Sequence, residues 1–191
     1  MKFTAIMFVG LLGLAVHAGI VIPVNGTTSD FISYGSINSV IDGVPDYNSS
    51  YLVMGNIAIG SFGGPYKIHF DLGGNYSLTG MNFWNNAGNL GNDGEGVRNF
   101  SLTFLDASLA VVGSYSDVAS DDLNQQVFSF AGVNAAYVDF TILSQHSETS
   151  ARQYAAFQEI NFISPVPEPT TPSLLACSAA MIGMWRRFKR N

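Results

Sequence analysis

The stretch YKIHFDLGGNYSLTGMNFW, residues 66–84, decides the fold. In its first seven residues, Ile68, Phe70 and Leu72 alternate with polar side chains. This period of two is the pattern of a β-strand that lies with one face on a core. Glycine and asparagine residues at 73–75 predict a turn, and a second strand is expected at 78–84.

Alternation of the same kind recurs along the middle of the chain. Apolar and polar residues alternate at 100–104, 138–142 and 160–162, and further strands are expected at 108–115 and 125–130. Turn-forming residues lie at 92–94 and 121–124, and no segment shows a long amphipathic helix. About eight short strands joined in this way predict an all-β fold, an antiparallel β-sandwich of jelly-roll type.

Length and charge narrow the class of protein. The 191 residues suffice for one domain with processing segments at its ends. Residues 19–163 hold thirteen acidic side chains against three basic ones, a net charge of about −10 without the histidines. Such a surface repels nucleic-acid phosphates and attracts hard cations such as Ca²⁺, so we do not expect nucleic-acid binding. The single cysteine, Cys177, excludes an internal disulfide.

Residues 1–18 have the three parts of a signal peptide. Lys2 supplies the positive charge, FTAIMFVGLLGLAV (3–16) is the apolar region, and small residues precede an expected cut after Ala18 by signal peptidase. The alternative is an N-terminal membrane anchor. We favour cleavage because the apolar run of about fourteen residues is shorter than the roughly 20 that a spanning helix needs.

The C-terminal end changes composition twice after the last expected strand. Residues 164–172, SPVPEPTTP, form a Pro-rich spacer. Residues 173–191 follow, with the apolar run SLLACSAAMIGMW and then the basic cluster RRFKR. The apolar run is short for a transmembrane helix, and the cations would hold the tail on the cytoplasmic side. We therefore expect only a transient stay in the membrane.

This arrangement closely resembles the PEP-CTERM sorting signal of Gram-negative bacteria. The residues that carry the likeness are Val166, Pro167, Glu168 and Pro169 at the motif and Arg186 and Arg187 at the start of the basic end. The resemblance implies recognition by an exosortase, which would cut near Pro-Glu-Pro and release or transfer the body to the cell surface or the extracellular matrix. Such proteins accompany exopolysaccharide and biofilm. Without processing, the tail would be a simple anchor.

Three segments of the middle domain resemble a second family. These are IHFDLGGNYSLTGMNFWNN (68–86), GVRNFSLTFLDA (96–107) and AAFQEINF (155–162), and they are similar to the galactose-binding-like jelly roll, above all its discoidin, or coagulation factor V/VIII type C, branch. The shared features, in order, are the Asp42-Gly43 turn, the strand end Asp71-Leu72-Gly73 and Glu159 before an apolar residue. The likeness covers roughly residues 30–163 and implies a domain spanning 19–163.

This second resemblance implies a structural calcium ion. Many carbohydrate-binding members hold Ca²⁺ between the early Asp-Gly loop and the last strand. Carried over, Asp42 and Glu159 supply carboxylates, and backbone carbonyls with Asp46 or Ser49 complete the oxygen shell that calcium requires. The alternative is that Asp42 only makes a turn and that Glu159 is a solvated strand residue.

The irregular stretch WNNAGNLGNDGEGVRNF, residues 84–100, is the candidate sugar-binding loop. Sugar sites combine an aromatic platform with planar polar groups that pair with hydroxyls. The candidate ligand-binding residues are Trp84, Asn85, Asn86, Asn89, Asp93 and Arg98. The same residue types also serve any Gly-rich turn, and a tryptophan at a strand end is often part of the core.

Catalytic motifs are lacking. Only His69 and His146 remain after removal of the leader, and no nucleophile elbow, HExxH motif or phosphate-binding glycine pattern accompanies them. We therefore expect an exported, non-catalytic carbohydrate-binding module of the cell surface or matrix, with a polysaccharide as partner. The alternatives are a structural envelope protein without a specific ligand and, third, a glycan hydrolase.

Overall fold

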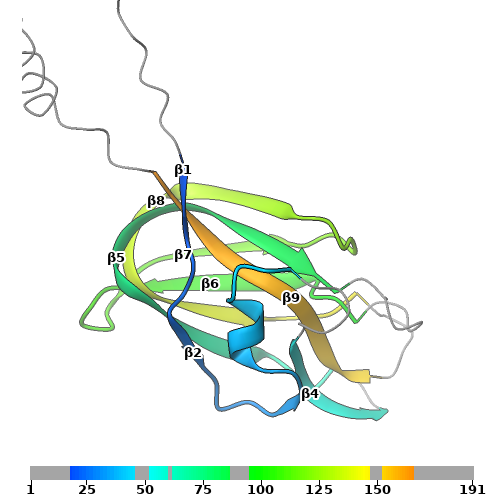
Figure 1. The fold of residues 1–191 in the computed structure, drawn as a ribbon. Helices are drawn as coiled ribbons and strands as arrows, with labels where there is room; N and C mark the ends of the chain where they lie inside the picture. The colour runs from blue at the N-terminus through cyan, green and yellow to red at the C-terminus, as the bar shows by residue number, and fades with distance from the viewer. Residues whose placement is uncertain (1–17, 46–51, 60–61, 87–94, 147–151, 166–191) are drawn as a thin grey trace, which may run out of the picture. The chain divides into compact units, whose positions relative to one another are not determined.

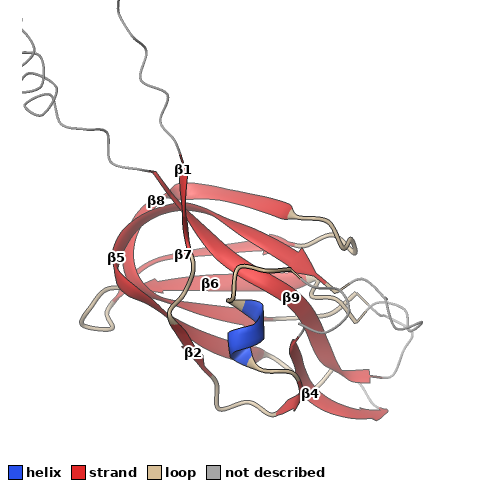
Figure 2. Ribbon diagram, viewed as in Figure 1, coloured by secondary structure: helices blue, strands red, loops and turns tan. Residues whose placement is uncertain are grey.

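The computed structural model describes residues 18–45, 52–59, 62–86, 95–146 and 152–165. Within the compact unit Gly19–Pro165, the described elements are β-strands and one short 3-10 helix (Figures 1 and 2). The elements are β1 (Ala18–Val21), β2 (Asn25–Thr27), β3 (Ile32–Tyr34), η1 (Ile37–Val40), β4 (Leu52–Ile59), β5 (Tyr66–Asn85), β6 (Asn99–Leu105), β7 (Val111–Val118), β8 (Gln126–Ile142) and β9 (Arg152–Pro165). None of the helices in these ranges has the length and apolar character needed to cross a membrane.

The strands form one continuous sheet that folds over itself. The strand order is β3-β4-β9-β5-β8-β6-β7, with β1 beside β9 and β2 beside β5. The pairs of β2 to β9 whose register is known are antiparallel, from β2–β5 to β6–β8. The predicted all-β, antiparallel sandwich is thereby confirmed.

The two layers share their longest strands, β5 and β8. The first part of β5 pairs with β2 and with the end of β8, where His69 lies opposite Asp139. The last part of β5 pairs with β9 and with the start of β8, where Phe83 lies opposite Ile160 and Gln126. Figure 1 shows β5 curving from one layer to the other at one side of the domain.

A bend inside β5 replaces the turn that the sequence predicts at 73–75. The register with β8 shifts between Asp71 and Tyr76, but the strand continues. Gly73 has φ +75°, and a Cβ there would lie 2.7 Å from a methyl group of Val24. Both facts require glycine, and the Asp71 carboxylate accepts from the Gly73 N–H at 2.8 Å. The Gly-Gly-Asn signal therefore marks a corner between the layers and not a hairpin.

Aromatic side chains fill the space between the layers. Phe83 is fully buried and packs against Phe100, Phe140 and Phe157, with ring centroids 5.5 to 6.2 Å apart. These side chains come from β5, β6, β8 and β9. The core thus ties together strands that are far apart in the sequence.

Candidate functional site

Asn85, the last residue of β5, closes the base of the loop that follows it. Its Nδ2 donates to the carbonyl oxygens of Val97 and Ser120 at 2.7 and 2.9 Å, and its Oδ1 accepts from the N–H groups of Val97 and Asn86 at 2.8 and 3.0 Å. The side chain is fully buried. All its donors and acceptors are used within the protein, so the prediction that Asn85 contacts a ligand is corrected: Asn85 is a structural clamp.

The other predicted loop residues divide into three groups. Asn86 is buried, with 6% of its surface exposed, and offers a ligand little contact area. Trp84 and Arg98 are half-buried. Trp84 lies opposite Glu159 of β9, and the backbone N–H of Arg98 donates to the Ser144 carbonyl at 2.9 Å. Asn89 and Asp93 lie outside the described residues.

Glu95 holds the far side of the same loop, a role that the sequence did not reveal. Its side chain is buried and accepts a hydrogen bond from the Tyr154 hydroxyl. Its carbonyl oxygen accepts from the Ala156 N–H at 2.9 Å. Both partners lie on β9, so no local sequence pattern could have indicated this contact.

The structure brings the Asp42-Gly43 turn and Glu159 together, as the resemblance to the galactose-binding-like family implies. The Glu159 side chain is fully buried on β9, and its Oε1 accepts from the Gly43 N–H at 3.1 Å. Gly43 has φ +80°, a conformation that favours glycine. Glu159 is therefore not a solvated strand residue, and the Asp42-Gly43 turn contacts the last strand.

Glu159 is held in an unfavourable electrostatic environment. Burial raises the pKa of its carboxyl to about 7, and the charge of Asp42 adds to the rise, while the hydrogen bond from Gly43 opposes it. Its Oε2 is buried and has no hydrogen-bond partner. A buried carboxylate oxygen without a partner beside a second acidic residue is a fitting donor for a hard cation.

Within the described part of the chain, no third acidic side chain joins Asp42 and Glu159. In the ranges that the structure describes, no three His, Cys, Asp or Glu side chains gather in a way that could hold a metal. Asp46 and Ser49, the other expected contributors, lie outside those ranges. Asp42 and Glu159 thus fit two positions of a calcium shell that main-chain carbonyls or these residues would have to complete.

A polar groove on the outer face of the first layer was not predicted from the sequence. It has a volume of about 420 Å³ and is lined by Thr27, Thr28, Ser29, Lys67, His69 and Asp139. Its lining residues come from β2, the segment after β2, β5 and β8. This volume lies in the range of small-molecule sites.

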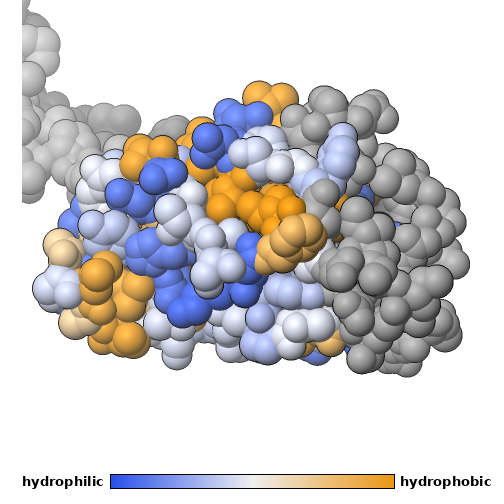
Figure 3. Space-filling model, turned by 90° about the horizontal axis from the view of Figure 1, so that it is seen from below, coloured by the Kyte–Doolittle hydropathy of each residue, from blue (hydrophilic) through white to orange (hydrophobic). Residues whose placement is uncertain are grey.

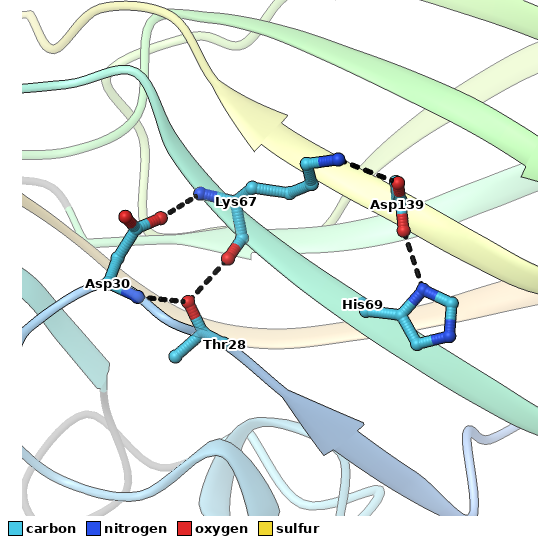
Figure 4. A network of polar contacts seen from close by, with 5 residues as sticks. All are labelled: Thr28, Asp30, Lys67, His69 and Asp139. Carbon is cyan, nitrogen blue, oxygen red and sulfur yellow. Dashed lines mark hydrogen bonds and ion pairs between the residues drawn. The ribbon is translucent and has the colours of Figure 1, made fainter.

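Asp139 is the centre of the groove's hydrogen-bond network (Figure 4). Its Oδ2 accepts from Lys67 Nζ at 2.9 Å, and its Oδ1 lies 2.6 Å from His69 Nδ1. Burial acts to raise the pKa of the Asp139 carboxyl, but the hydrogen bonds from His69 and Lys67 outweigh it, so the pKa is lowered. Asp139 therefore stays ionised and fixes the imidazole ring with Nδ1 toward it.

A second set of contacts fixes the groove's wall. The Lys67 N–H donates to the Asp30 carboxylate at 2.6 Å, and the Thr28 hydroxyl donates to the Lys67 carbonyl (Figure 4). The Asp30 N–H in turn donates to the Thr28 hydroxyl at 3.0 Å. The segment after β2 is thus fastened to β5, which makes the groove a preformed feature of the fold.

On the face seen in Figure 3, an apolar patch lies near the middle of the view and further apolar areas lie at its left and upper edges. Hydrophilic residues lie between them. Large exposed apolar side chains occur at several points of the domain, among them Val24, Phe31, Leu109, Val111 and Val127. Scattered residues of this kind are normal on a protein surface.

Comparison with known proteins establishes the fold. No protein-family model matches the chain, and no curated protein matches it. Solved structures do: the family 32 carbohydrate-binding module of Clostridium perfringens NanJ, in complex with galactose, has a TM-score of 0.59 at 12% identity, over 78% of this chain and 100% of that one.

Two further solved structures give the same result. The lectin-binding domain of lectinolysin in complex with Lewis b has a TM-score of 0.61 at 15% identity, over 80% of this chain and 100% of that one. A fucose-binding module of Streptococcus pneumoniae has a TM-score of 0.57 at 16% identity, over 76% of this chain and 94% of that one. The domain therefore has the galactose-binding-like, discoidin-like sandwich fold of family 32 carbohydrate-binding modules.

Replacing the clamp should cost stability. In Asn85→Ala, buried backbone groups of Val97, Ser120 and Asn86 lose their partner, and we expect the free energy of unfolding to fall by about 2 to 4 kcal/mol. The measurement is urea unfolding followed by fluorescence. The matched control is Asn134→Ala, at an exposed position of β8, which should change stability by less than about 0.5 kcal/mol. Equal effects of the two substitutions would contradict the role of Asn85.

Proposed function

We propose that this chain is a non-catalytic carbohydrate-binding module. The observation that carries the proposal is the fold, which is similar to that of modules solved with galactose and with Lewis b and to that of a fucose-binding module. A preformed polar groove supports it, because hydroxyl, imidazole, ammonium and carboxylate groups are the partners that sugar hydroxyls need. The proposed partner is a polysaccharide.

Binding of a polysaccharide is directly measurable. The full chain should be retained by at least one polysaccharide in affinity electrophoresis or on a glycan array that includes the exopolysaccharide of the organism itself. The control is the heat-unfolded chain, which should not be retained. Absence of retention on every polysaccharide would leave a structural envelope protein as the better description, and release of reducing ends would indicate a hydrolase.

The proposal includes a structural calcium ion at the Asp42–Glu159 corner. Support comes from the buried, unpartnered Oε2 of Glu159 and from the contact of Oε1 with the Asp42-Gly43 turn. Bound calcium would neutralise two neighbouring carboxylates and fasten the early loop to β9. In this position the ion has a role in stability and none in a reaction.

Calcium should raise the melting temperature. At a concentration 100-fold above its Kd the ion stabilises by about 2.7 kcal/mol, which corresponds to roughly 5 to 10 °C for a domain of this size. EDTA should reverse the rise, and Glu159→Gln should abolish it. Asp117→Asn, at an exposed carboxylate of β7, is the control and should keep it.

The metal-free protein should also show a defined pH dependence. The folded-state pKa of Glu159 lies near 7, above the ordinary value of 4.5. Between these two values the folded state binds a proton that the unfolded state releases, so stability should fall as the pH rises through this window. Glu159→Gln should flatten the dependence.

For the calcium site, the contradicting outcome is a melting temperature that does not depend on calcium, together with no metal in elemental analysis.

Export and C-terminal processing are the third part of the proposal. Support comes from the leader at residues 1–18 and from the sequence of Val166-Pro167-Glu168-Pro169, an apolar run and the basic cluster at 186–190. An exosortase would cut near Pro-Glu-Pro and deliver the domain to the cell surface or extracellular matrix of a Gram-negative bacterium. Residues 1–17 and 166–191 lie outside the described residues.

Processing can be checked by intact mass. In a Gram-negative host with an exosortase, the mature protein should begin at Gly19 and end near Pro169, without Arg186 and Arg187. The variant Pro167→Ala with Glu168→Ala should retain the tail, whereas Thr170→Ala should be processed normally. A mature wild-type protein that still ends in Asn191 would rule out cleavage.

A further inference from the structure

The groove at Lys67, His69 and Asp139 continues into rows of hydroxyl groups across the same layer. Residues that oppose each other in an antiparallel sheet share a face. The register places Asp139 opposite Thr103 of β6, and Thr103 opposite Ser114 of β7. The neighbouring row holds Thr141, Ser101 and Ser116 in the same way.

These hydroxyl-bearing side chains lie on the outer surface. Leu102 and Phe104 of β6 are buried in the core, so Ser101 and Thr103 between them point outward. Ser114 and Ser116 are exposed, and Thr141 is half-buried. From β2 to β7 the layer is five strands wide, which corresponds to roughly 19 Å at the usual strand spacing.

The charges of the groove select against an anionic ligand. The ammonium group of Lys67 is paired with the Asp139 carboxylate at 2.9 Å. The Asp30 carboxylate, which accepts from the Lys67 backbone N–H, adds a second negative charge beside the groove. Lys67 Nζ and His69 Nδ1 both contact the Asp139 carboxylate. An anionic ligand that approached either group would therefore also approach the negative charge of Asp139. A phosphate or a uronate would meet uncompensated negative charge here, whereas a neutral hydroxyl pair can donate to Asp139 and accept from Lys67.

The imidazole is positioned as a fixed wall of the groove. His69 stacks on Tyr137 with ring centroids 5.2 Å apart and 22° between the planes. With Nδ1 turned to Asp139, Nε2 is the ring nitrogen left for a ligand. The side chains in the groove are therefore held in place before any ligand arrives, which lowers the entropic cost of binding.

We propose that a neutral polysaccharide lies across the outer face of the β2-β5-β8-β6-β7 layer, with one sugar unit seated in the groove at Lys67, His69 and Asp139. The following units lie over the hydroxyl rows of β6 and β7. This inference rests on the proposed carbohydrate-binding function and assigns it to a sheet face, not to the predicted loop residues. The ligand class is a chain of neutral hexoses.

The test begins with the wild-type full chain on two sets of polymers. The neutral set is a galactan, a glucan and a mannan, and the acidic set is polygalacturonate and alginate. We expect retention on at least one neutral polymer and weaker retention on both acidic ones. Preference for the acidic set would overturn the assignment of a neutral ligand.

The second step uses the neutral polymer that binds best. Asp139→Asn and Lys67→Gln should each weaken binding about tenfold or more, the loss expected for one charge-assisted hydrogen bond. Thr103→Val, in the hydroxyl row, should weaken it several-fold. Lys67 is 58% exposed, so its substitution tests the groove even if Asp139→Asn fails to fold.

The controls separate the groove from the loop. Asp117→Asn removes one carboxylate from β7 on the face opposite Ser114 and Ser116 and should bind like wild type. If Arg98→Ala abolishes binding while the groove variants bind like wild type, the glycan lies at the loop, and this inference fails while the proposed function stands. If the wild type binds no polysaccharide, the proposed function itself fails.

Discussion

The pairing of β5 with β8 is the constraint on which the rest of the domain depends. It runs from Tyr66 opposite Ile142 to Phe83 opposite Gln126, and so belongs to both layers. On the inner side of this strand pair, Phe83 packs in the aromatic core. On its outer side the same register sets His69 against Asp139. A slip of one residue would exchange the two sides, so one register sets both the core packing and the polar groove.

Local alternation predicted the strands on which the fold depends, but not how they connect. The expected strands at 66–72 and 78–84 are halves of β5, and those at 125–130 and 138–142 are halves of β8. The residues Gly73-Gly74-Asn75 are typical of a turn, but the positive φ that glycine permits at position 73 serves a bend within a strand equally well. The strands from β1 to β4 were missed. They are short, apart from β4, and carry little periodicity of their own.

In the candidate site, too, residue types could be read from the local sequence, whereas contacts between residues far apart in the sequence could not. The contact between the Asp42 turn and Glu159 was inferred from resemblance and is present, whereas spacing alone could not have paired residues 116 positions apart, as Gly43 and Glu159 are. Asparagine is a residue type typical of sugar sites, but Asn85 is buried and makes four hydrogen bonds within the protein, which give it a structural role. The pairing of His69 with Asp139 depends on the register of β5 and β8, which no single segment encodes. Polar residues thus differ in function according to the side of the sheet that they occupy.

The neighbouring positions of β1 and β9 have a mechanical consequence. The first and the last strand of the domain pair with each other, and Figure 1 shows both strands reaching the same end of the domain. A force applied to these first and last strands would therefore act directly on the β1–β9 pair, and through β9 on its neighbours β4 and β5.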